Sequence, residues 1–213
     1  MKPYFETALG KLYNCDCLEF MKEMEDKSVD LVLADPPYGI GEDKRKSDKS
    51  GRREYNDDWD YRPTNSIFIE ILRTSVNSII WGGNYFSSTL PDSRGWLIWD
   101  KVQKFTGADC ELAWTSFDSS TKSFRKSRVE VHSKMNKKHP TQKPLELMVW
   151  CIKFADKQTR PTLVLDPFLG SGTTAVACEK LGRKWIGIEI SEKYCEIAAK
   201  RISLEASQGK MFL

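Results

Sequence analysis

The sequence has few of the residues from which metal sites and disulfide scaffolds are built. Only two of its 213 residues are histidine, His132 and His139, and none of the six cysteines lies in a C-x-x-C pair. A structural zinc site needs four ligands at characteristic spacings, so we expect no metal. The chain also starts without an apolar signal segment, so we expect reduced thiols and a cytoplasmic location.

Long hydrophobic runs are absent as well. Runs such as residues 31–34 are far shorter than the ~20 apolar residues of a membrane helix, so we expect no contact with a membrane. Hydrophobic residues make up 40% of the chain and charged residues 30%, which is typical of a soluble globular protein. The length of 213 residues predicts one domain with a sizeable core.

Positive charge is concentrated in two segments. Residues 119–143 contain eight lysines and arginines against Glu130 alone, a local net charge of +7 in a chain whose total is +3. A second basic cluster, residues 44–53, precedes an acidic stretch at 54–60. Both basic segments fit either solvated loops or arms that contact a polyanion. The candidate polyanion contacts are Lys44, Arg45, Arg52, Arg53, Lys122, Arg125, Lys126 and Arg128.

Short apolar runs alternate with helical patterns along the chain. Continuous runs at 28–34 and 162–165 predict buried parallel strands, and the spacing at 145–155 predicts a helix that begins after Pro144. The other expected strands are 77–81, 95–99, 111–114 and 184–188, and the other expected helices are 66–75, 174–181 and 192–204. This alternation predicts a three-layer, Rossmann-like α/β fold with a mostly parallel sheet in a single domain, residues 1–213.

A glycine-rich turn follows one expected strand and opens a helix. It reads Asp166-Pro167-Phe168-Leu169-Gly170-Ser171-Gly172-Thr173-Thr174, and its two glycines let the backbone turn sharply and approach a ligand. Glu189 ends the next strand, where a carboxylate can accept hydrogen bonds from both ribose hydroxyls of a nucleoside. The glycines alone also fit an ordinary packing turn. The full strand–turn–helix–strand–acid order favours a nucleoside cofactor.

A rigid turn, Asp35-Pro36-Pro37-Tyr38, follows the strand expected at 28–34. The two prolines fix φ and remove two backbone donors, so the Asp35 carboxylate and the Pro36 carbonyl are both presented as acceptors. Two acceptors suit an amino group with two hydrogens, and Tyr38 offers a flat face to a planar ring. Taken alone, this turn also fits a stiff strand-to-loop corner.

Together these two turns resemble the motifs of the S-adenosylmethionine-dependent DNA amino-methyltransferases, which modify N6 of adenine or N4 of cytosine. The Asp35 turn precedes the glycine turn, and this circularly permuted order is similar to that of the beta group of the family. Three further segments also match the family's pattern, and all five occur along the chain in the order of the family. The resemblance therefore covers nearly the whole chain. The three further segments are Asn14-Cys15-Asp16-Cys17, Trp81-Gly82-Gly83-Asn84-Tyr85-Phe86 and His139-Pro140-Thr141-Gln142-Lys143-Pro144.

The resemblance implies the catalytic roles of Asp35, Pro36, Pro37 and Tyr38. Asp35 and the Pro36 carbonyl would accept hydrogen bonds from the target amine and localise its lone pair for in-line attack on the methyl group. Because a base inside a duplex cannot reach such a site, the target would be flipped out and stacked on Tyr38.

The resemblance also implies a class I methyltransferase fold and S-adenosylmethionine as cofactor. Asp16 would meet the adenine of the cofactor, Glu189 its ribose, and Lys143 its methionine carboxylate, while Phe168 would line the pocket or simply pack. The implied cofactor residues are Asp16, Asp166, Phe168, Gly170, Gly172, Thr173, Glu189 and Lys143.

The implied substrate is duplex DNA. Residues 41–63 and 118–138 lack apolar periodicity, so we predict them as inserted loops that contact DNA phosphates. Such a short recognition region implies either a short recognition sequence or low sequence specificity, and a homodimer would supply extra surface. A cognate restriction endonuclease is a further candidate partner.

Several alternatives stay open within this interpretation. Asp at the first position of the catalytic turn favours N6 of adenine, and N4 of cytosine is the alternative. Enzymes that methylate RNA or protein glutamine use related turns, which more often begin with Asn. A DNA-binding protein that has lost its catalytic activity is the non-enzymatic alternative, and the intact Asp35, Tyr38, Gly170 and Gly172 argue against it.

Overall fold

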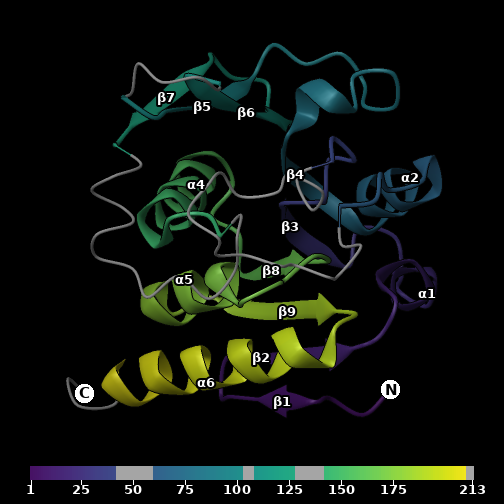
Figure 1. Cartoon of the computed structure of the whole chain (residues 1–213), viewed down its shortest axis with the longest axis vertical. Helices are drawn as coiled ribbons and strands as arrows, with labels where there is room; N and C mark the ends of the chain where they lie inside the picture. The colour runs from purple at the N-terminus through teal and green to yellow at the C-terminus, as the bar shows by residue number, and fades with distance from the viewer. Residues whose placement is uncertain (42–59, 103–107, 128–141, 210–213) are drawn as a thin grey trace, which may run out of the picture.

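A nine-stranded sheet runs through the computed structural model, which describes residues 1–41, 60–102, 108–127 and 142–209 (Figure 1). The strand order is β1-β2-β9-β8-β3-β4-β6-β5-β7. The strands are β1 (Phe5–Glu6), β2 (Gly10–Asn14), β3 (Val29–Ala34), β4 (Ser75–Trp81), β5 (Trp96–Asp100), β6 (Cys110–Thr115), β7 (Lys122–Arg125), β8 (Leu163–Asp166) and β9 (Lys184–Glu189). The helices are α1 (Cys17–Lys22), α2 (Asn65–Thr74), the short 3-10 helix η1 (Gly83–Tyr85), α4 (Leu145–Gln158), α5 (Thr173–Leu181) and α6 (Glu192–Gly209).

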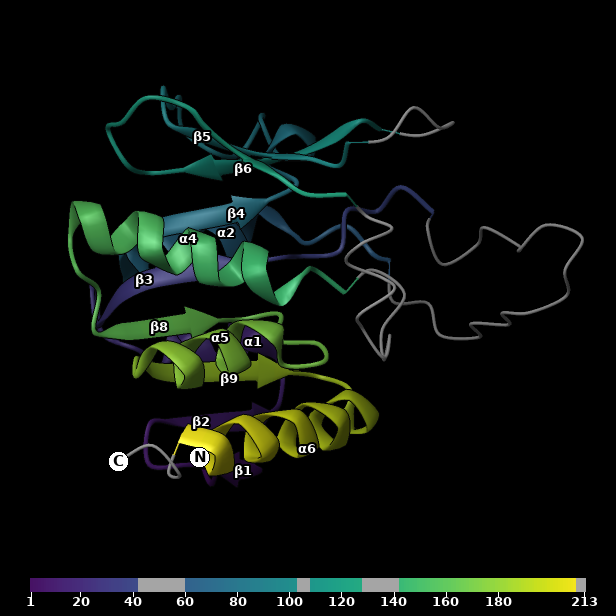
Figure 2. The same cartoon turned by 90° about the vertical axis from the view of Figure 1, so that its left-hand side faces the viewer.

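The middle of the sheet is parallel. Strands β2, β9, β8, β3 and β4 pair in parallel, and β8 and β9 can be seen pointing the same way in Figure 2. The chain runs outward from β8 to β9 on one side and from β3 to β4 on the other, so the strand order reverses between β8 and β3. In open α/β sheets, ligands bind outside the carboxyl ends of the strands at such a reversal point.

Strand β3 shows how the sheet builds a core on each face. Leu31 and Leu33 pack into the cluster that includes residues of α4, α5 and α6, whereas Val32 and Ala34 pack into the cluster that includes residues of α1 and α2. This alternation follows from the two-residue period of a strand, and all four side chains are buried because helices cover both faces. The predicted three-layer α/β fold is confirmed.

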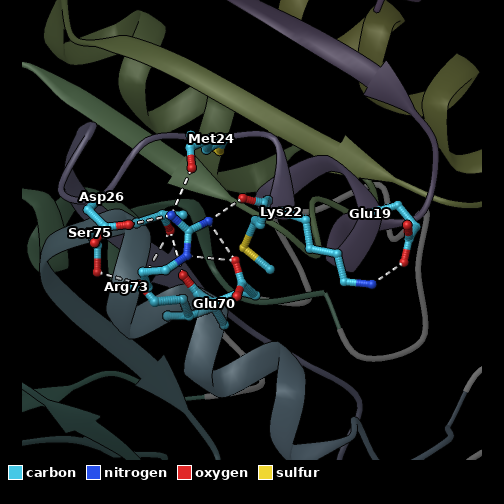
Figure 3. A network of polar contacts seen from close by, with 10 residues as sticks. Glu19, Lys22, Met24, Asp26, Glu70, Arg73 and Ser75 are labelled. Atoms are coloured by element: carbon cyan, nitrogen blue, oxygen red, sulfur yellow. Dashed lines mark hydrogen bonds and ion pairs between the residues drawn. The ribbon is translucent and has the colours of Figure 1, made fainter.

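One arginine of α2 fixes the turn that leads from α1 into β3 (Figure 3). Arg73 donates hydrogen bonds to the backbone carbonyls of Met21 and Met24, at 2.7 and 2.8 Å. It also donates to the carboxylates of Asp26 and Glu70, each at 2.6 Å. The hydrogen bonds that Arg73 donates to the two carboxylates raise its pKa above the usual value, so the guanidinium stays charged. These contacts hold the start of β3, whose far end carries the rigid turn.

Each expected strand and helix is present, and the boundaries differ most at the carboxyl ends of helices. Helix α6, for example, continues to residue 209 rather than ending at 204. The elements that were not expected are β1, β2, α1, η1 and β7. No helix among the described residues is long and apolar enough to cross a membrane.

The prediction that residues 118–138 form a loop is wrong near its start, where Lys122–Arg125 forms β7. This edge strand pairs in parallel with β5, and its Phe124 packs against Trp150 of α4 with ring centroids 5.6 Å apart. Because β5 and Trp150 both lie outside residues 118–138, the sequence of this segment shows no periodicity that would predict the strand. Residues 42–59 and 128–138 of the two predicted loops lie outside the described residues. The same holds for the candidate DNA contacts Lys44, Arg45, Arg52, Arg53 and Arg128.

Candidate active site

The two predicted turns meet at the reversal point of the sheet. Asp35 follows β3 and Asp166 ends β8, and these two strands are hydrogen-bonded neighbours. The two carboxyl groups are close enough for the charge of Asp35 to contribute to raising the pKa of Asp166. The structure therefore brings the two turns together although 131 positions separate Asp35 from Asp166 in the chain.

Asp35 accepts two hydrogen bonds on a single carboxylate oxygen. Its Oδ1 atom accepts from the Nζ atom of Lys143 at 2.6 Å and from the hydroxyl of Tyr38 at 2.9 Å. Burial raises the pKa of Asp35, and the ion pair with Lys143 opposes that rise. Within the described part of the chain, the Oδ2 atom of Asp35 has no hydrogen-bond partner. One acceptor of this carboxylate is therefore left for an incoming amino group.

Tyr38 is held between an aromatic ring and a glycine. Its ring stacks on Tyr85 with centroids 5.0 Å apart and an interplanar angle of 25°. The other contact is with Gly82, where an added Cβ would lie 2.2 Å from the Cε1 atom of Tyr38. Gly82 also has a φ of +70°, which favours glycine on its own. The conformation of Tyr38 therefore depends on the Trp81-Gly82-Gly83 segment, and stacking on a target base stays a prediction.

Glu111 and Lys101, which belong to none of the sequence motifs, extend the ion pair between Asp35 and Lys143. The Oε2 atom of Glu111, on β6, lies 3.1 Å from the Nζ atom of Lys143, and its Oε1 atom lies 2.9 Å from that of Lys101. Burial alone would raise the pKa of Glu111, but the two lysines lower it to about 2. The Lys143 ammonium also lies over the rings of Tyr38 and Trp81, at 5.4 and 5.9 Å. Lys143 thus pairs with carboxylates of the chain itself, and its predicted contact with the cofactor stays a prediction.

On the cofactor side, Glu189 organises the turn with both of its oxygens. Its Oε2 atom accepts from the backbone N–H of Gly170 at 2.7 Å, and its Oε1 atom accepts from that of Ser191 at 2.8 Å. The side-chain amide of Asn14, at the end of β2, donates to the carbonyls of Glu189 and Ile190 at 2.9 and 3.0 Å. The ends of β2 and β9 are thereby joined beside the glycine turn.

The two glycines of the turn differ in their surroundings. Both have positive φ, +53° for Gly170 and +85° for Gly172. A Cβ on Gly172 would lie 3.0 Å from Ala198 of α6. Among the described residues, a Cβ on Gly170 would meet only the Phe168 carbonyl, at 3.9 Å. The turn is therefore packed on one side and open on the other. An open backbone beside the Glu189 carboxylate fits the nucleoside part of S-adenosylmethionine.

The remaining residues of the turn are held by local contacts. Asp166 is buried, and its Oδ1 atom accepts from the backbone N–H of Phe168 at 2.9 Å. Burial is the main reason that the pKa of Asp166 rises to about 7. The hydroxyl of Thr173, the first residue of α5, accepts from Arg201 at 3.2 Å. These contacts shape the turn, and direct contact of Asp166, Phe168 and Thr173 with the cofactor stays a prediction.

Asp16 caps a helix. Its Oδ1 atom accepts from the backbone N–H groups of Leu18 and Glu19, at 2.8 and 3.1 Å, and so forms the N-cap of α1. Asp16 lies two residues after the carboxyl end of β2, the strand next to β9. The predicted contact with the cofactor adenine is compatible with this position and stays a prediction.

Three of the candidate DNA contacts are described, and they lie on β7 or just after it. Lys122 is exposed, and Arg125 is 74% exposed although it pairs with Asp100 at 3.3 Å. Lys126 is only 22% exposed, and its Nζ atom lies 2.7 Å from Glu146 of α4. Lys122 and Arg125 are therefore better placed than Lys126 to present positive charge to a polyanion.

A family model described as DNA methylase, of the N6/N4 methyltransferase type, matches residues 94–200. That span is half of the chain and runs from the start of the β5–β6 hairpin into α6. The chain therefore belongs to the N6/N4 DNA methylase family. This membership confirms the resemblance found in the sequence, and with it S-adenosylmethionine as the cofactor.

Known relatives are similar along most of the chain. Type II methyltransferase M.BamHI from Bacillus amyloliquefaciens is 29% identical over 99% of this chain but only 61% of its own length, so this chain spans about three fifths of that relative. Type II methyltransferase M2.LlaDCHI from Lactococcus lactis subsp. cremoris is 27% identical, with 98% and 94% covered. Among solved structures, the M1.HpyAVI–SAM complex is 25% identical over 91% of this chain and 100% of that one, with a TM-score of 0.58.

Proposed function

We propose that this protein transfers a methyl group from S-adenosylmethionine to N6 of adenine in duplex DNA. The observation that carries the proposal is the position of Asp35 at the reversal point of the sheet, with the glycine turn on the neighbouring strand and no partner for its Oδ2 atom among the described residues. The Asp35 carboxylate lies where the rigid turn and the glycine turn meet, which supports an amino group and a nucleoside cofactor being bound side by side there. The named relatives are type II methyltransferases, which is consistent with this activity and with a linked restriction endonuclease.

Asp35 and Pro36 would prepare the nucleophile. The exocyclic nitrogen of adenine is a poor nucleophile because its lone pair is delocalised into the ring. The Oδ2 atom of Asp35 and the carbonyl of Pro36 can each accept one amino hydrogen, which pulls the lone pair out of the ring. The carboxylate also offsets the positive charge that develops on the nitrogen, and much of the rate would come from orientation.

The cofactor supplies a methyl group bonded to a positively charged sulfur. The chain would hold its nucleoside part at the open side of Gly170, with the Glu189 carboxylate facing the ribose and Asp16 near the adenine. Gly172 and Asp166 would keep the turn in shape from behind, since both are packed inside the protein. Because their contacts are internal, these two residues would act on cofactor affinity through the conformation of the turn.

Duplex DNA is the proposed substrate, and the target base would leave the stack to reach Asp35 and Tyr38. Lys122 and Arg125 on β7 offer exposed positive charge for phosphate contacts that position the duplex. A homodimer would extend this surface, because the described recognition-side elements are short.

N4 of cytosine is the second candidate target. Its amino group also offers two hydrogens to Asp35 and Pro36, and the matching family model covers both N6 and N4 methylation. The Asp at position 35 is the feature that favours adenine.

Labelled S-adenosylmethionine and duplex DNA of mixed sequence test this function. After incubation with the protein, the DNA is digested to nucleosides and the label is located. We expect label in N6-methyladenine, and none when Asp35→Ala replaces the wild type. Label in N4-methylcytosine alone would support the second candidate instead, and the absence of label from all nucleosides would overturn both.

A further inference from the structure

Four ionised side chains form a continuous row of alternating charge behind the rigid turn. Lys143 contacts Asp35 at 2.6 Å and Glu111 at 3.1 Å, and Glu111 contacts Lys101 at 2.9 Å. They come from four places in the fold: the end of β3, the segment before α4, β6, and the residue after β5. The row contains two positive and two negative charges, so it is neutral as a whole.

Lys143 occupies the middle of this row and depends on both carboxylates. Its side chain is only 6% exposed, and an ammonium so far from water is costly unless it is paired. With Glu111 present, the positive charge is shared between two carboxylates. Without Glu111, the whole attraction of Lys143 would fall on Asp35, which would then be a weaker hydrogen-bond acceptor for any other group.

We propose that Glu111 is a positioning residue for methyl transfer: it shares the Lys143 ammonium with Asp35, and so keeps Asp35 a strong acceptor for the target amine. Lys101 holds Glu111 in place by pairing with its other oxygen. The inference rests on the proposed function, since it explains how Asp35 is kept ready for the amine. Glu111 itself acts through Lys143 and touches neither substrate.

The proposal gives opposite effects for two neighbours of Asp35. Among the described residues, the titratable groups that face Asp35 are Tyr38 on its own turn, Lys143 before α4, Glu111 on β6 and Asp166 on β8. Lys101 contacts Glu111 and not Asp35. Burial raises the pKa of Asp35, Lys143 lowers it, and Glu111 raises it. Removing the charge of Glu111 should therefore lower this pKa, and removing the charge of Lys143 should raise it.

The test compares Glu111→Gln with Lys143→Gln. Single-turnover methyl transfer is measured against pH at saturating cofactor and DNA, and the pKa of the Asp35 carboxyl is measured by carbon-13 NMR in the protein alone. For Glu111→Gln we expect a rate about 10- to 100-fold lower at neutral pH. We also expect a lower Asp35 pKa, and an acidic limb of the pH–rate profile that lies at lower pH. For Lys143→Gln we expect both to shift to higher pH.

Asp156→Asn is the matched control. Asp156 has a similar exposure, 23% against 24% for Glu111, and pairs with Arg183 near the other end of α4. This variant should leave the profile and the Asp35 pKa unchanged, and thermal unfolding checks that each variant is folded.

A lower rate in Glu111→Gln without a shift of the Asp35 pKa would overturn the proposal, because that result marks a merely structural role. If Glu111→Gln does not fold, the absence of an upward shift in Lys143→Gln overturns it equally. A wild-type protein that methylates no DNA refutes the proposed function, and the NMR titration still decides whether Glu111 and Lys143 act on Asp35 in opposite directions.

Discussion

The part of the site that we propose binds the cofactor (the cofactor half) lies at the ends of β2, β9 and β8. It is built differently from the part that we propose carries the reaction (the catalytic half), at the ends of β3 and β4 and the start of β6. In the cofactor half, the carboxylates of Asp16, Asp166 and Glu189 each accept from a backbone N–H two positions further along the chain. In the catalytic half, Asp35 accepts from Tyr38 three positions away, but its charged partner is Lys143, which lies 108 positions away. Backbone groups, several of them close by in the chain, thus shape the proposed place for the cofactor, whereas paired charges from distant segments shape the proposed place for the reaction. Substitutions in the two halves should therefore separate cofactor binding from rate.

Removing the central carboxylate should give the largest effect. With Asp35→Ala, methyl transfer should fall roughly 1,000-fold or more, because the amine loses the acceptor that offsets its developing charge. Calorimetric titration with S-adenosylmethionine should give nearly wild-type affinity. Lost cofactor binding together with a retained rate would contradict the division between the two halves.

Asp166→Asn tests how the cofactor turn is held. In the folded protein the pKa of Asp166 is about 7, above its ordinary value of 3.8, so the folded state favours the protonated carboxyl. The stability that this group contributes is complete below about pH 4 and is lost as the pH rises to about 7. Between these pH values the free energy of unfolding of the variant should gain on the order of 3 kcal/mol relative to the wild type, as measured by urea denaturation. A difference that does not change with pH would argue against a buried, protonated Asp166.

Gly82→Ala tests the catalytic half by placing a methyl group against the Tyr38 ring. The new Cβ would lie 2.2 Å from the Tyr38 ring, so the ring must move, and we expect the rate to fall about 100-fold with cofactor affinity retained. Gly182→Ala is the matched control, because Gly182 also has a positive φ but no atom lies within 4 Å of its added Cβ. Equal losses of rate in the two variants would show that backbone strain, rather than the position of Tyr38, is responsible.

Glu189→Gln probes the cofactor half. The carboxylate uses one oxygen for Gly170 and the other for Ser191, and a glutamine has only one oxygen acceptor, so one of these N–H groups loses its partner. We expect the Kd for S-adenosylmethionine to rise about tenfold, with a much smaller change in rate at saturating cofactor. Calorimetry and single-turnover kinetics measure the two quantities. A large loss of rate with unchanged affinity would reverse the assignment.

The double variant Lys122→Ala/Arg125→Ala should have the smallest effect. If β7 contacts phosphates, the slope of log affinity for DNA against log salt should fall by up to about 2. Lys126→Ala should change the slope less, since Lys126 pairs with Glu146. An unchanged slope in the double variant would remove β7 from the DNA interface.

The residues that the sequence could predict are those whose structure is local. The glycine turn from Asp166 to Thr174 directly follows β8 and leads into α5, so the strand, the glycines and the helix are consecutive in the sequence. The carboxylate that contacts this turn, that of Glu189, ends the next strand. The prolines after Asp35 fix the other turn by themselves. The alternating apolar runs in turn predict the layers of the fold.

The residues that escaped prediction depend on the assembled sheet. Glu111 is an ordinary polar residue within β6, and Lys101 is another that follows β5. Only the pairing of β4, β6 and β5 brings them to Lys143. Strand β7 likewise exists because β5 offers it an edge. No motif marks contacts that form between segments far apart in the chain.

The identity of the methylated base tests the central claim most directly. DNA from cells that express the wild-type protein, and from cells that express Asp35→Ala, can be read by modification-aware sequencing. The proposed function predicts N6-methyladenine at one short recurring sequence with the wild type and none with the variant. DNA without a new modified base, or the same N6-methyladenine pattern from the Asp35→Ala variant, would contradict it.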